Sequence, residues 1–95
     1  MSPGGNRMRI KEGYVINKLG DGYVVVTVGD ASNDFNGVIR LNAAGAFLWQ
    51  SIQDGADSRQ KLLQSMAERY DDFDEIIAGK DLDEFLENIA LALEE

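Results

Sequence analysis

Oxygen-bearing side chains alternate along residues 30–37, in the way that a calcium-binding loop spaces its ligands. Two features argue against calcium. Phe35 stands where such a loop requires glycine, and no glutamate follows at the position that would bind the ion through both of its oxygens. We therefore interpret the segment as a polar loop in which Asn36 and Gly37 form a turn.

Carboxylates also gather at residues 71–75, where they could bind a cation weakly. Acidic residues favour the positive end of a helix dipole, so a helix start explains this group more simply. Paired carboxylates for acid–base catalysis occur elsewhere in the chain, but no nucleophile, metal-ligand set or pocket-forming motif accompanies them. We expect no metal and no catalytic residue.

Histidine and cysteine are both absent from the chain. Their absence excludes zinc fingers, iron–sulfur sites, disulfides and every Ser–His or Cys–His dyad. The sequence also contains neither a phosphate-binding P-loop motif nor a dinucleotide fingerprint. We therefore expect no cofactor, and no enzymatic activity from this chain alone.

Acidic residues are concentrated at the C-terminal end of the chain. The whole chain has nine basic and 17 acidic side chains, a net charge of −8. Residues 1–42 have a net charge of +1 and residues 43–69 are neutral, whereas residues 70–95 carry ten acidic side chains against Lys80 alone. This segment would repel a polyanion such as DNA. It is either a solvated helix face or a surface that attracts a basic partner.

The length of 95 residues fits one domain, and the 44% of apolar side chains is enough for one small core. Pro3 and the glycines after it predict a flexible N-terminus over residues 1–9, which leaves residues 10–95 as a single domain. The longest apolar run, residues 89–93, is too short to span a bilayer, and the N-terminus has no apolar signal core. We expect a cytoplasmic protein with no membrane partner.

The first half of the domain has the composition of β-strands. Two runs rich in β-branched and aromatic residues, 14–19 and 23–28, predict a pair of strands. Asp21 and Gly22 lie between them and predict a hairpin turn in which both central residues have positive φ. A third strand, 38–41, is short and comes last, which places it at an edge of the sheet.

After the third strand the apolar residues follow a helical period. Asn42 predicts the N-cap of a helix that runs to about Gln53. Asp57 and Gln60 resemble a capping box for a second helix over residues 58–70. Trp49 could stack on a nucleobase, but its spacing with neighbouring apolar residues favours the core.

The third helical region is less regular, because its apolar phase slips at Gly79. Glycine inside a helix costs roughly 1 kcal/mol relative to alanine. Either one helix kinks there, or a short turn at residues 74–78 precedes a helix capped by Asp81. Beyond the slip, a regular apolar stripe consists of Leu82, Phe85, Leu86, Ile89 and Leu93.

Three short strands followed by three helices predict an α+β fold with a three-stranded antiparallel sheet, whose one apolar face the helices bury. This order of elements also suits a winged-helix-like arrangement. The residues alone indicate a small, non-catalytic binding domain. It would offer a partner an unpaired strand edge and an acidic helix.

The run FNGVIRLNAAGAFLW at residues 35–49 resembles the signature of PqqD-like proteins, in which a short strand ends in Leu-Asn and opens a helix with an aromatic face. The resemblance starts near residues 10–14 and crosses the predicted hairpin. It then runs through Arg-Tyr-Asp at 69–71 to Asp-Leu-Asp-Glu-Phe-Leu at 81–86. In all it covers about residues 8–93.

This resemblance implies a winged-helix-like domain that recognises precursors of ribosomally made, post-translationally modified peptides. Such domains bind the leader segment of the precursor and present the rest to a modifying enzyme, often of the radical S-adenosylmethionine type. The leader lies as an added strand against the third strand, in a groove walled by the third helix. By position, the peptide-binding residues are Val38, Ile39, Arg40 and Leu41 on the strand and Leu82, Phe85, Leu86 and Ile89 on the helix.

Two other functions stay open, and we expect a monomer in each case. A winged-helix regulator that binds DNA needs a basic recognition helix, but residues 58–70 hold only Arg59, Lys61 and Arg69 against Glu68. A regulatory adaptor with no peptide ligand would differ in its genomic neighbourhood. A short precursor-peptide gene and a modifying-enzyme gene beside this one would argue against the adaptor.

Overall fold

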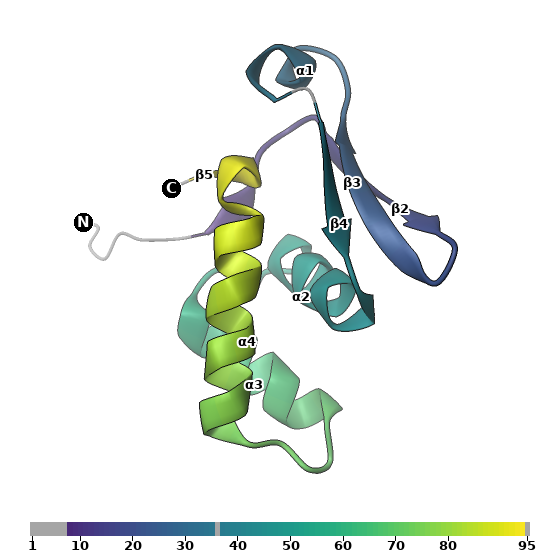
Figure 1. Ribbon diagram of the computed structural model, residues 1–95. Helices are drawn as coiled ribbons and strands as arrows, with labels where there is room; N and C mark the ends of the chain where they lie inside the picture. The colour runs from purple at the N-terminus through teal and green to yellow at the C-terminus, as the bar shows by residue number, and fades with distance from the viewer. Residues whose placement is uncertain (1–7, 36, 95) are drawn as a thin grey trace, which may run out of the picture.

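A three-stranded antiparallel sheet forms the N-terminal part of the fold, in a computed structural model that describes residues 8–35 and 37–94 (Figure 1). Its strands are β2 (Tyr14–Leu19), β3 (Gly22–Thr27) and β4 (Val38–Leu41), in the order β2-β3-β4. The predicted third strand is confirmed, and β4 lies at an edge of the sheet. Together with the helices that follow, this sheet confirms the predicted α+β class.

The turn between β2 and β3 differs from the prediction. Leu19 pairs with Gly22, so the two loop residues are Gly20 and Asp21. Gly20 has φ 61°, and no non-glycine residue among the described ones has positive φ. Glycine therefore stands at the first central position, as in a type II′ turn, and the prediction of Asp21 and Gly22 as central residues is wrong. Gly20 adopts the left-handed conformation without the steric cost that Asp21 would incur.

The first two long helices have the predicted extents to within a residue, but one cap differs. In α2 (Ala43–Gln53), the predicted N-cap Asn42 is confirmed, since its Oδ1 accepts a 2.8 Å hydrogen bond from the N–H of Gly45. In α3 (Arg59–Arg69), the N-cap is Ser58, whose Oγ accepts from the N–H of Lys61 at 3.2 Å. The predicted capping box at Asp57 is therefore wrong.

Helix α4 (Glu75–Asn88) is continuous through Gly79. Asp74 is its N-cap, because its Oδ1 accepts hydrogen bonds from the first-turn N–H groups of Ile76 and Ile77. The alternative of a shorter helix capped by Asp81 is therefore wrong. The apolar phase slips at the start of the helix because Ile76 and Ile77 are exposed there, at 85% and 60%.

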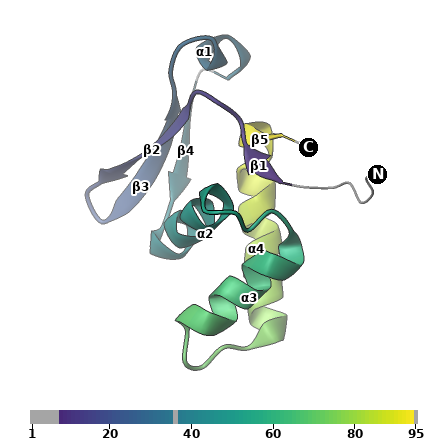
Figure 2. The same cartoon turned by 180° about the vertical axis from the view of Figure 1, so that it is seen from behind.

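The helices pack one after another, and α2 is the one that contacts the three-stranded sheet most closely. Helix α2 contacts β3 and β4 on one side and α3 on the other, and α3 packs against α4. Figure 2 shows α2 between the sheet and the pair formed by α3 and α4. Trp49 is fully buried, which confirms it as a core residue. The other buried core side chains of the strands and long helices, with the C-cap residue of α4 as the last, are Tyr14, Val25, Ile39, Leu41, Leu48, Ile52, Leu62, Met66, Ala78, Leu82, Phe85 and Ile89.

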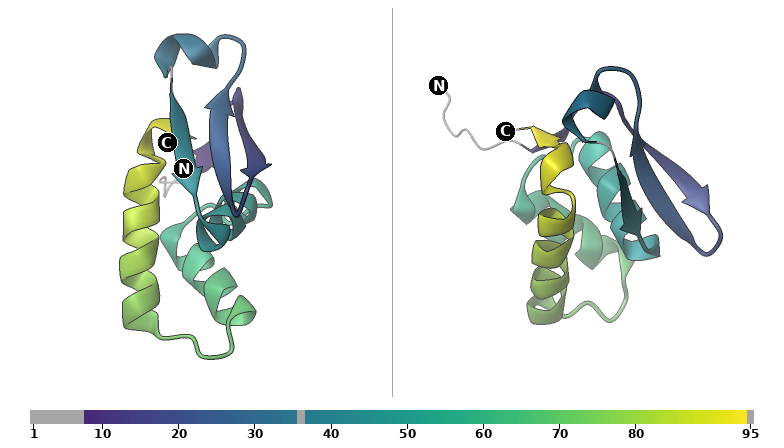
Figure 3. Two further views of the ribbon diagram at one scale, coloured as in Figure 1. Left: turned by 45° about the vertical axis from the view of Figure 1, so that its right-hand side comes forward. Right: turned by 45° about the horizontal axis from the view of Figure 1, so that its top comes forward.

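Several short elements have no counterpart in the prediction. The strands β1 (Arg9–Ile10) and β5 (Leu93–Glu94) pair antiparallel beside the C-terminal end of α4, next to the 3-10 helix η1 (Ala90–Ala92) (Figure 3). The helix α1 (Ala31–Asp34) occupies part of the predicted polar loop. The predicted flexible segment 1–9 falls largely on residues 1–7, which lie outside the described residues. Arg9 is part of β1, and the assignment of residues 10–95 to a single domain stays a prediction.

Candidate functional site

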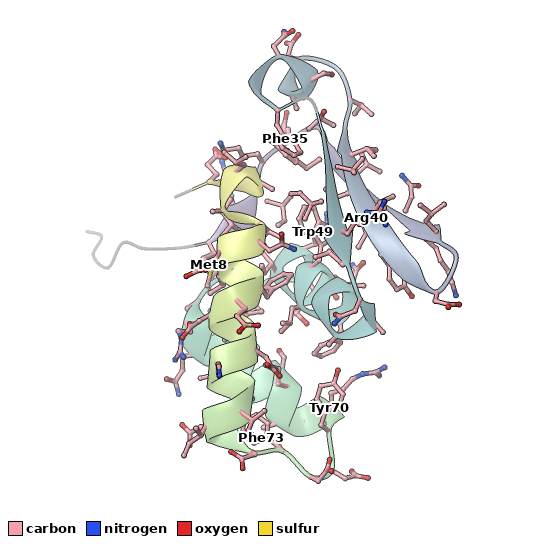
Figure 4. The ribbon with its side chains drawn as sticks, in the orientation of Figure 1. Met8, Phe35, Arg40, Trp49, Tyr70 and Phe73 are labelled. Carbon is pink, nitrogen blue, oxygen red and sulfur yellow. The ribbon has the colours of Figure 1, made fainter. Side chains whose placement is uncertain are left out.

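A groove of about 690 Å³ lies between the C-terminal end of the edge strand β4 and helix α4. Residues from the start of α2, the end of α3 and the connection between α3 and α4 complete its walls. Figure 4 labels one residue from each of three walls: Arg40 on β4, Tyr70 at the end of α3, and Phe73 in the connection. The groove therefore joins the edge of the sheet to the helical part of the fold.

The floor of the groove is apolar. Leu48, Met66 and Phe85 line it and are buried, with at most 7% of their surface exposed. Phe73 is half-buried and Ile77 is exposed, so apolar surface also reaches the groove wall. A ligand in this groove would remove apolar surface from water, which favours binding by about 25 cal/mol per Å².

The rim of the groove is acidic. Four carboxylates line it, all from exposed residues: Asp72, Asp74, Asp81 and Glu84. The carboxylate of Asp74 is engaged with the first turn of α4. Arg40 is the basic side chain among the described lining residues. The rim therefore carries a net negative charge and favours a cationic group.

One hydrogen bond crosses the groove and shows how the edge of β4 is oriented. Nδ2 of Asn88 on α4 donates to the main-chain carbonyl of Arg40 at 3.1 Å. In an antiparallel strand the main-chain groups of successive residues point to opposite sides. The N–H and C=O of Arg40, and those of Val38 two residues before it, therefore face away from β3. Those of Ile39 and Leu41 face β3, in register with Val25 and Tyr23.

The structure places the four predicted strand residues on β4 in two alternating sets. Val38 and Arg40 are exposed, whereas Ile39 and Leu41 are buried against the core. Leu41 nevertheless lines the groove together with Arg40. The strand can therefore offer main-chain groups to a ligand while half of its side chains hold the sheet onto the helices.

The four predicted helix residues are placed differently. Leu82 and Ile89 are fully buried core residues, and Leu86 is half-buried and outside the groove lining. Phe85 is the member of this set that lines the groove. Peptide contact by these residues stays a prediction, but the core positions of Leu82 and Ile89 leave them no free surface in this structure.

Half of the α4 residues that line the groove are polar, and the sequence interpretation missed this polar part of the helix face. It holds Asp81, Glu84 and Asn88 at spacings of three and four residues, each one position before a core residue. The signal was present, because residues at these spacings share one side of a helix. Of the apolar stripe predicted to line the groove, Leu82 and Ile89 pack into the core, and Phe85 reaches the groove lining.

Sites of other kinds are not evident in the described ranges. No group of three or more acidic side chains within residues 8–35 and 37–94 is arranged to hold a metal ion. The loop that was compared with a calcium site contains α1, and Ser32 Oγ there donates to the carbonyl of Gly29 at 2.7 Å. Over the same ranges, no helix combines the length and apolar character that crossing a bilayer requires.

Comparison with known proteins agrees with this architecture. A solved structure described as TbiB1 in complex with the TbiA(beta) leader peptide is similar to the chain, with a TM-score of 0.70 and 20% identity. The similarity covers 90% of this chain and 94% of that one, and it supports the fold. No curated protein sequence matches the chain. The profile of the family described as Coenzyme PQQ synthesis protein D (PqqD) matches residues 15–91. The resemblance to PqqD-like proteins is thus confirmed, and the chain belongs to the PqqD family.

Proposed function

We propose that this chain is a recognition element for ribosomally made precursor peptides, which captures the leader segment and presents the precursor to a modifying enzyme. The observation that carries the proposal is the free edge of β4, which faces a groove walled by α4. Family membership supports it, as does the similar fold of a protein solved with a leader peptide.

Capture takes place by strand addition at β4. An extended peptide forms main-chain hydrogen bonds with a free strand edge whatever its sequence, and alternate side chains then supply specificity. The outward main-chain groups of Val38 and Arg40 are the pairing positions on β4. The peptide's side chains point alternately toward the groove and toward the outer face of the sheet. Those in the groove meet Leu41 and Phe85, and those on the outer face lie beside the side chains of Val38 and Arg40.

The same geometry suits a carrier that must release its peptide. A disordered leader loses conformational entropy when it becomes a strand, so its affinity is moderate for the area that it buries. Nothing in the groove acts as a catalyst in this proposal, because its polar groups serve to bind and position. The family resemblance supports a modifying enzyme of the radical S-adenosylmethionine type as the second partner and a monomeric chain.

The placement of the basic residues on α3 does not favour DNA binding. Arg59 Nε binds Asp83 at 2.9 Å and Lys61 Nζ binds Asp57 at 2.9 Å, so both cations are paired within the protein. The guanidinium of Arg69 lies 5.3 Å above the ring of Phe47. A DNA-reading helix needs such side chains free to contact phosphates and base edges.

The proposal is tested by calorimetric titration with the leader of a precursor peptide encoded beside this chain. We expect saturable one-to-one binding, and no binding of a scrambled leader. A leader N-methylated at alternate residues of its pairing segment loses the hydrogen bonds of the added strand while it keeps its side chains. We expect it to bind at least about ten-fold more weakly, the equivalent of roughly one net hydrogen bond to a main-chain partner. Equal binding of the methylated leader would contradict strand addition.

A further inference from the structure

The groove extends past one end of β4 rather than along its whole length. Arg40, Leu41 and Asn42 line it, whereas Val38 and Ile39 do not. The groove therefore lies at the C-terminal end of the strand, toward the start of α2 and the connection between α3 and α4. A peptide added antiparallel to β4 runs in the opposite direction, so its residues on the N-terminal side of the pairing segment reach this groove.

The groove combines an apolar floor with an acidic rim. Leu48, Met66 and Phe85 form the buried floor, and the carboxylates of Asp72 and Asp81 stand at the rim. A long aliphatic stem with a cation at its tip matches both features, because lysine and arginine bury their methylene groups along apolar surface and keep the charge at the edge. A purely apolar side chain would fill the floor and leave the rim charges unmatched, and an acidic side chain would be repelled.

We propose that this groove is a specificity pocket for one lysine or arginine of the bound peptide, on the N-terminal side of the residues that pair with Val38 and Arg40. The inference rests on the proposed function and adds to it the chemical class of the anchoring side chain. Asp72, Asp81 and Glu84 are its partners at the rim. Asp74 is left out because its carboxylate already accepts the N–H groups of Ile76 and Ile77.

Selection from a random peptide library tests the pocket without knowledge of the natural leader. Dodecapeptides displayed on phage are selected on the immobilised full chain. The enriched sequences are then aligned on the core segment that they share, which is the segment expected to pair with β4. We expect lysine or arginine to be enriched several-fold at one fixed position before that core. Enriched peptides without any such position would overturn the inference and leave strand addition intact. No enriched peptide at all would contradict the proposed function and the inference with it.

Matched variants separate the pocket from the overall negative charge. The variant Asp72→Asn/Asp81→Asn removes two rim charges, and the control Glu68→Gln/Glu87→Gln removes two charges from exposed residues outside the groove lining. We expect the positional enrichment to fall strongly with the first variant, which keeps Glu84 as the remaining partner at the rim, and to persist unchanged with the control. If the enrichment were lost equally in both variants, the inference of a pocket would be overturned, because the overall negative charge of the chain would explain the preference. The single variant Asp81→Lys gives an independent readout, because it should select aspartate or glutamate at the same peptide position.

Discussion

The side-chain amide of Asn88 donates a hydrogen bond of 3.1 Å to the main-chain carbonyl of Arg40 and so links α4 to the free edge of β4. A peptide strand paired at Arg40 would bring its own N–H to that carbonyl. The amide of Asn88 therefore occupies, in the unbound protein, a position that the added strand requires. It also protects an exposed strand edge, which would otherwise be open to pairing with other chains.

Replacing Asn88 tests this competition. We expect Asn88→Ala to bind the leader more tightly, by up to about five-fold, because a net hydrogen bond of about 1 kcal/mol no longer has to be broken. The neighbouring exposed change Glu87→Ala, outside the groove lining, is the control and should leave the affinity unchanged. Calorimetry measures both. Weaker binding by Asn88→Ala would mean instead that the amide contacts the peptide.

A second prediction concerns Phe85, the groove-lining aromatic residue of α4. Phe85→Ala should weaken leader binding more than about ten-fold, as expected when a buried aromatic contact at the centre of an interface is truncated. The side chain is 7% exposed, so the same change can cost roughly 3–5 kcal/mol of fold stability. Circular dichroism must therefore show that the variant is folded, and Phe85→Leu, which keeps most of the apolar volume, serves as a milder variant. A folded variant with unchanged affinity would show that Phe85 does not contribute to leader binding.

A third prediction concerns the acidic C-terminal part, with ten acidic side chains and one lysine after residue 69. Raising the salt concentration from low to about 0.5 M should slow association of a basic leader several-fold, because exposed charges act mainly by steering and are screened beyond roughly 8 Å even at physiological salt. Dissociation should stay nearly constant, since salt does not screen the apolar contacts of the groove floor. Stopped-flow fluorescence of a labelled leader measures both rates. An association rate that does not change with salt would mean that the acidic segment serves only to keep the protein in solution.

The ion pair between Arg59 and Asp83 gives a prediction about pH. The hydrogen bond from Arg59 lowers the pKa of the Asp83 carboxyl below its ordinary value, with a further contribution from the guanidinium charge. A lowered pKa means that the pair stabilises the fold above the unfolded-state pKa and that this contribution is lost as the pH falls through the folded-state pKa. Asp83→Asn should therefore be slightly less stable than the wild type at neutral pH and equally stable at strongly acidic pH. Urea unfolding at several pH values checks this, and a difference that persisted in acid would contradict it.

Local signals were enough to predict most of the elements. The short strand predicted over residues 38–41 is β4, and the side chain of Asn42 defined the start of α2. Where two local signals competed, the prediction could fail. Asp57 and Ser58 are both good caps, and only the packed structure shows that Asp57 accepts a hydrogen bond from Lys61 Nζ at 2.9 Å while Ser58 caps the helix.

Features that depend on distant parts of the chain were not predictable. The strands β1 and β5 have two residues each and pair with each other although they lie far apart in the sequence, so neither has a local pattern. Helix α4 continues through Gly79 from its cap at Asp74, and Nη2 of Arg59, 20 residues away in the sequence, donates to the Gly79 carbonyl at 3.4 Å. The polar side chains of α4 that line the groove each precede a predicted groove residue by one position, and the prediction missed them for a similar reason. Neighbouring stripes of a helix have the same spacing, and the packing of α4 against α3 helps to decide which one is buried.

Amide hydrogen exchange of β4, followed by NMR with and without the leader, tests the central claim most directly. In the free protein the outward N–H groups of Val38 and Arg40 should exchange quickly, whereas those of Ile39 and Leu41, paired with β3, should exchange slowly. On addition of the leader we predict that the exchange of Val38 and Arg40 slows strongly, with chemical-shift changes concentrated on β4 and on residues 81–88 of α4. If Val38 and Arg40 exchange as fast in the complex as in the free protein, and the largest shifts fall on α3, strand addition at β4 is contradicted.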